Sequence, residues 1–238
     1  TIAEMATKYD VYVITDEVYE HIVYAPHKHT YFATLPGMWN RTISCSSLSK
    51  TYSITGWRLG YIIAPEEIID RAKKVHDFLT VGCAAPLQEA VIPGLEFGQD
   101  YYDDLLAKYT HKKDLFLKGL DDLHISHNDP EGAYYVLLDI REYGYESDLQ
   151  FCKNLAREVG VGAVPGSSFF REPVNHLIRL HFAKNDDTLN EALNRLERMP
   201  KPRKMPRFRS GHRQRGISQQ KRGKKMKKHC ANRIPKNY

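Results

Sequence analysis

The sequence of 238 residues predicts an α/β fold, and three observations carry this prediction. Short β-branched and aromatic runs have the length of strands, and they alternate with longer segments whose apolar residues recur at helical spacing. Hydrophobic residues make up 42% of the chain, enough for one large or two small cores. The mixture of strands and helices suits an α/β domain, and the helical stripe of residues 100–123 is long enough to bridge two lobes.

The first elements of the chain lead to a carboxylate and a phenol. Thr1–Lys8 has the apolar spacing of the end of a helix, and residues 9–15 predict a strand that is covered on both faces. Asp16 and Tyr19 follow at its carboxyl end, where ligands of open α/β sheets bind. A helix N-cap aspartate followed by a packing tyrosine is the alternative interpretation.

A lysine follows among hydroxyl groups and small residues, in the stretch Ser46–Tyr61. A lysine acts as a nucleophile only after it loses its proton, and Lys50 has the type of surroundings that such a lysine needs. Ser47 and Arg58 supply a hydroxyl and a planar guanidinium, which are the groups that hold a phosphate, and Gly56 and Gly60 let the backbone come close. Taken alone, Ser-x-x-Lys is a common tetrapeptide, and Gly-Trp-Arg-x-Gly fits a buried turn with a surface arginine.

The remaining elements are predicted from the same periodicities. We expect strands at 41–47, 59–64, 133–140, 161–164 and 176–183, and helices at 65–80, about 87–97, 100–123 and 148–159, with a last helix that Asp186 or Asp187 caps.

Neither the histidines nor the cysteines predict a metal site. His21, His27 and His29 lie in a polar connection without a cysteine or paired carboxylate, so we expect a solvated loop there. The cysteines lack metal-ligand spacing, and we expect reduced thiols, with Cys45 and Cys83 buried and unreactive. The four cysteines are Cys45, Cys83, Cys152 and Cys230.

Together, Ser47-x-x-Lys50 and Gly56-Trp57-Arg58-x-Gly60 resemble the lysine signature of class I/II aminotransferases, which are pyridoxal 5'-phosphate enzymes of fold type I. The resemblance covers about residues 1–199. It implies that residues 1–99 are the second half of a cofactor-binding large domain with a mostly parallel sheet. Residues 100–199 then form a linking helix and a small C-terminal α/β domain, and the N-terminal half of the family fold is lacking.

The resemblance also implies how the cofactor is held. Lys50 is the catalytic lysine that binds pyridoxal phosphate covalently, and Ser47 and Arg58 bind its phosphate. Asp16 faces the ring nitrogen, and Tyr19 lies near the ring oxygen.

Arg179 resembles the arginine with which the family grips the substrate α-carboxylate. It lies in an Ile-Arg-Leu run after the turn Pro165-Gly166, as the family arginine does. An exposed arginine on the solvent face of a strand is the alternative interpretation. Residues 81–84 lack the distal arginine of dicarboxylate-specific members, so we do not expect strict aspartate specificity.

The function implied is transamination between an amino acid and a 2-oxo acid, most like the kynurenine, aromatic and broad-specificity members, by a homodimer when full length. A catalytically inactive fragment and a fold-type I β-lyase remain alternatives. No run reaches the roughly 18 apolar residues of a membrane span, and the chain begins without a signal-peptide pattern, so we expect a cytoplasmic protein that is not bound to membranes.

The last residues of the chain have a different composition. Of the 35 basic residues, 15 lie in residues 201–238, which contain no Asp or Glu; the first 200 residues therefore hold 20 basic and 29 acidic residues, a formal charge of −9. We expect residues 200–238 to be disordered. Nucleic-acid binding by this tail is a weaker alternative function, a solvated tail or a non-native end being the competing interpretations.

Overall fold

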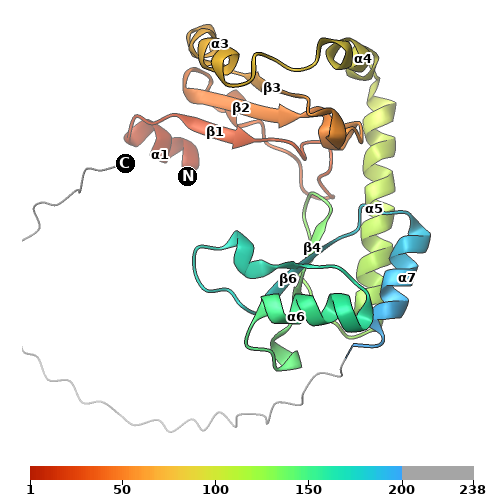
Figure 1. Cartoon of the computed structure of the whole chain (residues 1–238). Coiled ribbons are helices and arrows are strands. Elements are labelled where there is room, and N and C mark those ends of the chain that lie inside the picture. The colour runs from red at the N-terminus through yellow and green to blue at the C-terminus, as the bar shows by residue number, and fades with distance from the viewer. Residues whose placement is uncertain (200–238) are drawn as a thin grey trace, which may run out of the picture. The chain divides into compact units, whose positions relative to one another are not determined.

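The computed structural model describes residues 1–199, so the predictions of disorder and nucleic-acid binding for residues 200–238 lie outside the described part. Two three-stranded sheets are present in this part (Figure 1). The first contains β1 (Val13–Asp16), β2 (Thr42–Ser47) and β3 (Gly60–Ile63) in that order. Its first pairing is parallel and its second antiparallel, so the prediction of a mostly parallel sheet is wrong for the described residues.

The connection between β2 and β3 explains the antiparallel pairing. It consists of the short helix α2 (Leu48–Thr51) and a 3-10 turn at Thr55–Trp57. The amide of Leu48 donates to the carbonyl of Leu59 over 3.2 Å, so the two ends of the connection lie side by side. A connection that closes in this way returns the chain antiparallel, whereas a parallel neighbour needs a longer crossover.

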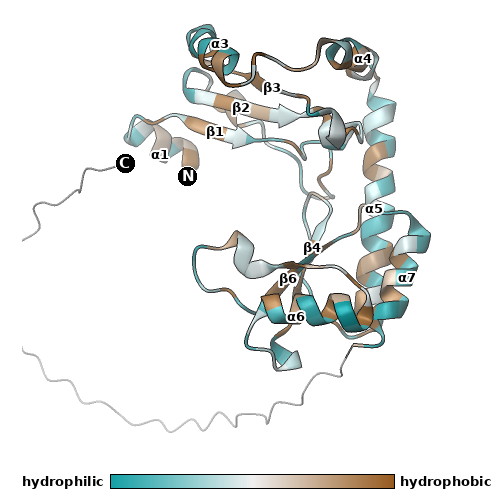
Figure 2. Cartoon of the chain, viewed as in Figure 1, coloured by the Kyte–Doolittle hydropathy of each residue, from teal (hydrophilic) through white to brown (hydrophobic). Residues whose placement is uncertain are grey.

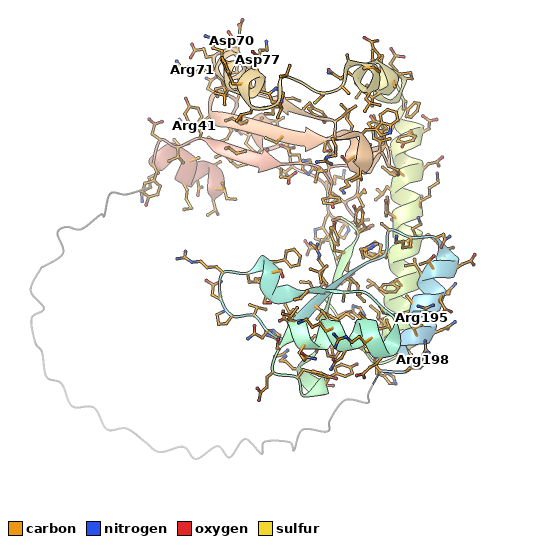
Figure 3. All side chains as sticks on the ribbon, in the orientation of Figure 1. Arg41, Asp70, Arg71, Asp77, Arg195 and Arg198 are labelled. Carbon is orange, nitrogen blue, oxygen red and sulfur yellow. The ribbon has the colours of Figure 1, made fainter. Side chains whose placement is uncertain are left out.

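Strand β1 is shorter and more open than the sequence predicts. It begins at Val13, and Ile14 is 71% exposed, so the prediction of a strand covered on both faces is wrong. The helix α1 (Ile2–Lys8) ends just before Asp10, whose φ is +48°. Arg41, which Figure 3 labels, binds this turn. Its Nη1 donates to Ala6 O, Asp10 Oδ1 and Val11 O over 3.1 to 3.3 Å.

The second sheet is antiparallel throughout, with the order β4–β6–β5. Its strands are β4 (Tyr135–Asp139), β5 (Val164–Pro165) and β6 (Leu177–His181). One face is buried through Val136, Leu138, Ile178 and Leu180. The hydrophobic colouring of these strands and of the helix sides near them marks this core (Figure 2).

Three helices contribute to that core: α5 (Gln99–Asp122), α6 (Asp148–Asn154) and α7 (Asp186–Leu196). The predicted helix 148–159 ends at Asn154 and continues as a π-helical turn, Leu155–Val159. The predicted strand 161–164 is reduced to β5. The N-cap of α7 is Asn185, which accepts from Thr188 N over 3.0 Å, and not Asp186 or Asp187.

A second, smaller core lies beside the lysine stretch. Leu48, Leu59 and Val91 are buried together, and Val91 comes from α4 (Ala85–Leu95). The helix α3 (Glu66–Thr80) has no buried residue. No helix within residues 1–199 is both long enough and apolar enough to span a membrane.

The three cysteines of the described part differ in exposure. Cys152 is buried and Cys45 half-buried, and burial raises the pKa of each thiol, as expected for unreactive cysteines. The prediction of a buried thiol is wrong for Cys83, which is exposed. Cys83 lies in the turn between α3 and α4, where small residues favour the turn and do not bury it.

Candidate active site

The carboxyl ends of β1 and β2 form a cavity that Asp16 and Ser47 line together. Parallel pairing places Asp16 opposite Cys45, so both strands end at the same edge of the sheet. The cavity has a volume of about 360 Å³ and is lined by Ile14, Thr15, Asp16, Val18, Cys45, Ser46 and Ser47. The carboxylate of Asp16 is exposed, and within residues 1–199 it accepts only a long bond from Val18 N, 3.3 Å away, so it is available to a ligand.

Ser47 fixes the start of the helix that carries Lys50. Its Oγ caps α2 by accepting from Ser49 N over 3.1 Å, and it also lies 2.7 Å from Ser49 Oγ. Its hydroxyl reaches Leu59 O at 3.1 Å. A Cβ atom on Gly60 would lie 2.8 Å from Ser46 O, so only glycine lets β3 come this close to the lysine stretch.

Aromatic residues at the start of α5 fix the other end of α2. The hydroxyl of Tyr101 donates to Thr51 O over 2.8 Å, and the hydroxyls of Tyr52 and Tyr102 lie 3.0 Å apart. Ser47, before Lys50, thus contacts Leu59 beside β3, and Thr51 and Tyr52, after Lys50, contact α5. These contacts restrict the backbone that carries Lys50. The Nζ atom of Lys50 lies 6.0 Å from the ring centroid of Tyr134, and no lysine ion pair within residues 1–199 involves it.

Tyr19 contacts the two tyrosines at the beginning of β4. Its ring packs edge-to-face on Tyr134 and Tyr135, with centroids 5.2 and 6.0 Å away. Its hydroxyl donates to the hydroxyl of Tyr135 over 3.0 Å. Burial, with the neighbouring hydroxyls, raises the pKa of Tyr19 far above its ordinary value, so the phenol is protonated at neutral pH.

Arg179 lies on the less buried face of β6, among aromatic rings. Its guanidinium carbon lies 4.1 Å from the ring centroid of Tyr135 and 3.9 Å from that of Phe169. The arginine ion pairs within residues 1–199 are those of Arg41, Arg141 and Arg195, and none involves Arg179. A half-buried guanidinium without a carboxylate partner among these residues is suited to bind an anionic ligand.

Comparison with known proteins identifies the family. The family model described as "Aminotransferase class I and II" matches residues 1–196 of this chain. The chain belongs to this family. The family uses pyridoxal 5'-phosphate.

Among the relatives is a probable N-succinyldiaminopimelate aminotransferase of Mycobacterium tuberculosis, 36% identical over 205 residues that are 82% of this chain and 52% of that protein. Methionine aminotransferase of Escherichia coli is 36% identical over 192 residues, 80% of this chain and 50% of that protein. The solved structure of the M. tuberculosis N-succinyldiaminopimelate aminotransferase matches with a TM-score of 0.78 and 37% identity, and covers 82% of this chain and 52% of that one. The chain thus spans about half the length of these aminotransferases.

Of the predicted site residues, only Asp16 and Ser47 line the cavity at the ends of β1 and β2, and Tyr19, Lys50 and Arg179 do not. Arg58 also lies outside it. Arg58 is exposed, has φ +57°, and donates from Nη1 to Thr55 O over 3.0 Å. Its role as a phosphate ligand remains a prediction.

Glu17 and His29 form a polar pair that sequence reasoning missed. Glu17 is only 5% exposed, and its Oε2 lies 2.7 Å from His29 Nε2 while its Oε1 accepts from Thr15 Oγ1 over 2.7 Å. Burial alone raises the pKa of Glu17, but the hydrogen bonds from His29 and Thr15 outweigh it and lower the pKa. The prediction of a solvated loop is therefore wrong at His29. The position of Glu17 directly after Asp16, at a strand end, was the available indication.

Proposed function

We propose that this chain carries the cofactor-binding and carboxylate-binding groups of a transamination reaction between an amino acid and a 2-oxo acid. The observation that carries the proposal is one aromatic cluster, Tyr19, Tyr134 and Tyr135. Lys50 of α2 approaches it at Tyr134, and Arg179 of β6 approaches it at Tyr135. A lysine and an arginine around a common cluster are the two groups that such a reaction needs, one for the proton and one for the substrate carboxylate.

The residues at the β1–β2 edge fit pyridoxal phosphate. The cavity of about 360 Å³ is within the usual range for small-molecule sites, and its exposed carboxylate and serine hydroxyls suit a protonated ring nitrogen and a phosphate. In this proposal Asp16 binds the ring nitrogen, Ser47 and Arg58 bind the phosphate, and the phenol of Tyr19 lies near the ring oxygen. When bound, the cofactor supplies an electron-withdrawing ring that acidifies the Cα–H bond of the amino acid.

Lys50 and Arg179 have separate roles in the proposed reaction. The Nζ atom of Lys50 would bind the cofactor covalently. Once released, it would take the proton from Cα of the amino acid and deliver it to the cofactor. Arg179 holds the α-carboxylate and so fixes which Cα bond faces the lysine. A fold-type I β-lyase would use the same groups, so the nature of the product decides between the two reactions.

The donor amino acid is proposed only as a class. Residues 81–84 contain no arginine for a second carboxylate, which supports a broad or aromatic donor range over strict aspartate specificity. The names of the relatives also differ in substrate: N-succinyldiaminopimelate, methionine and, for a bovine relative 33% identical over 212 residues (80% of this chain, 47% of that one), kynurenine. We propose a homodimer for the full-length protein.

The test is covalent attachment of the cofactor. The 238-residue chain is incubated with pyridoxal phosphate and reduced with sodium borohydride, and the modified peptide is identified by mass spectrometry. We expect the label on Lys50, with loss of the label in Lys50→Ala and retention in the exposed control Lys73→Ala. A label on another lysine refutes the proposed site. A label on Lys50 without release of a 2-oxo acid supports the alternative of a catalytically inactive chain.

A further inference from the structure

The strands that flank β6 bring an aromatic ring to Arg179 from each side. β6 is the central strand of its sheet, and Arg179 pairs with Leu137 on β4 and with Val164 on β5. Tyr135 lies two residues before Leu137, on the same face as Arg179, at the diagonal position that a long side chain can reach. Phe169 follows β5 and approaches from the other neighbour. The guanidinium carbon lies 4.1 Å from the Tyr135 centroid and 3.9 Å from the Phe169 centroid.

A glycine allows the segment that carries Phe169 to lie close to β6. This segment is a 3-10 turn, Gly166–Phe169, directly after β5. A Cβ atom on Gly166 would lie 2.5 Å from Leu177 O and 2.9 Å from Leu177 C, which are backbone atoms that cannot move aside. The turn therefore packs against β6 only because residue 166 has no side chain.

A buried carboxylate holds the same turn. Asp148 is 2% exposed, and its Oδ2 accepts from Ser167 N over 2.7 Å while its Oδ1 accepts from Ser167 Oγ over 3.1 Å. Asp148 lies at the start of α6, and its two hydrogen bonds from Ser167 fix both the position and the tilt of the turn. Phe169 is thus placed by buried structure although its own ring is partly exposed.

This arrangement determines which surface of the guanidinium a ligand can reach. Aromatic rings favour the flat faces of a guanidinium, where no hydrogen bond is made, and leave its N–H edge free. A carboxylate binds at that edge, in the plane of the guanidinium, through two parallel hydrogen bonds. Without Phe169, the Arg179 side chain gains rotamers that point the edge elsewhere.

We propose that Phe169 is a positioning residue that, together with Tyr135, holds the Arg179 guanidinium with its N–H edge toward the substrate carboxylate. The proposal rests on the proposed function, in which Arg179 binds that carboxylate. Phe169 acts through Arg179 and touches no reacting atom.

The first measurement follows Arg179 directly in the 238-residue chain, without cofactor. In a ¹⁵N-arginine-labelled sample the Nε–H resonance of Arg179, assigned by its loss in Arg179→Leu, should lie upfield because of the two rings. Phe169→Leu should move it toward the resonances of the exposed arginines, and Phe169→Tyr, which keeps the ring, should leave it in place. The neighbouring Phe170→Leu is the matched control, because Phe170 is similarly exposed and makes no ring contact with Arg179 within the described residues.

The second measurement is a titration with sodium acetate against sodium chloride at constant ionic strength, read at the same resonance. The loss of one exposed cation–π contact should weaken acetate binding roughly two- to fivefold in Phe169→Leu, with Phe170→Leu and Phe169→Tyr unchanged. Equal spectra and affinities for Phe169→Leu and Phe170→Leu overturn the proposal, and so does a fall in thermal stability with no change at Arg179. Absence of cofactor attachment to Lys50 counts against the proposed function alone.

Discussion

The hydroxyl of Tyr19 donates a hydrogen bond to the hydroxyl of Tyr135 over 3.0 Å, although the two residues lie 116 positions apart in the chain. Tyr19 follows β1 in the first sheet, whereas Tyr135 begins β4 in the second. Tyr135 also lies over the guanidinium of Arg179. The proposed cofactor tyrosine and the proposed substrate arginine therefore contact the same ring, which links the two halves of the site.

The half-buried phenol of Tyr19 predicts a loss of stability at high pH. Burial and the neighbouring hydroxyls raise its pKa in the folded chain, so above pH 10 it ionises more readily in the unfolded chain than in the folded chain. The free energy of unfolding should therefore be unaffected by this group below pH 10 and should fall above it, by at most about 1.4 kcal/mol per pH unit. Urea unfolding between pH 9 and 11 should show a smaller fall for Tyr19→Phe than for the exposed control Tyr9→Phe. Equal falls would contradict the burial of this phenol.

Lys50 and Arg179 should separate cofactor binding from substrate binding. Arg179→Leu should leave pyridoxal phosphate attached to Lys50, because the guanidinium of Arg179 packs against Tyr135 and Phe169 and is not one of the proposed cofactor-binding groups. It should weaken the interaction with the amino acid by about 2 to 5 kcal/mol, the cost of losing one partner of a charge-assisted pair. Lys50→Ala should abolish covalent attachment. Borohydride labelling and the amino-acid dependence of the cofactor absorbance measure the two effects, and an unaltered amino-acid response in Arg179→Leu would make the arginine a surface residue.

The contribution of Asp148 to the free energy of unfolding should depend on pH. Burial by itself raises the pKa of this carboxyl, but hydrogen bonds from Ser167 and from the amide of Leu149 outweigh it and lower the pKa below 3.8. Its contribution is therefore present above pH 3.8 and is lost as the pH falls through the lower folded value. Asp148→Asn turns one acceptor into a donor beside the amide of Ser167 and should cost about 1 to 3 kcal/mol at pH 7.

Urea unfolding at pH 7 and pH 3 measures this effect, with the exposed Asp104→Asn as the matched control. The gap between the two variants should narrow at pH 3, because the carboxyl of Asp148 takes up its proton in the unfolded chain below pH 3.8. A gap of the same size at both values would show that Asp148 acts through packing and not through its charge.

Local patterns in the sequence were sufficient where the chain itself supplies the neighbours. Ser47 and Lys50 lie within one turn of each other, and Asp16 follows its own strand, so their arrangement needed only the strand and helix assignments. The contact of Phe169 with Arg179 depends on the pairing of β5 with β6, and that of His29 with Glu17 on the fold of a long loop. Neither depends on a spacing that periodicity can detect.

The prediction of a mostly parallel first sheet was wrong for a related reason. The composition of a strand does not encode its direction. It does not ensure burial either, because Ile14 is exposed although it lies in a β-branched run. The direction of β3 depends on how the lysine stretch closes between Leu48 and Leu59, a backbone contact that the side-chain pattern does not encode.

The two glycines of the lysine stretch should respond differently to substitution. A Cβ atom on Gly60 would lie 2.8 Å from the backbone oxygen of Ser46, so Gly60→Ala must displace β3 or the residues before Lys50, at a cost of about 1 to 3 kcal/mol. Gly56 has no atom within 4 Å of its Cβ position and no positive φ, so Gly56→Ala should be neutral or should stabilise by up to about 1 kcal/mol through the unfolded chain.

Urea unfolding and cofactor labelling of both variants measure this contrast. Gly60→Ala should lower the yield of label on Lys50 as well as the stability, because Ser47 and Lys50 move with the strand end. Gly56→Ala should retain both. If the two variants lose label equally, the close approach of β3 to Ser46 is not what positions Lys50, and both glycines serve the phosphate of the cofactor instead.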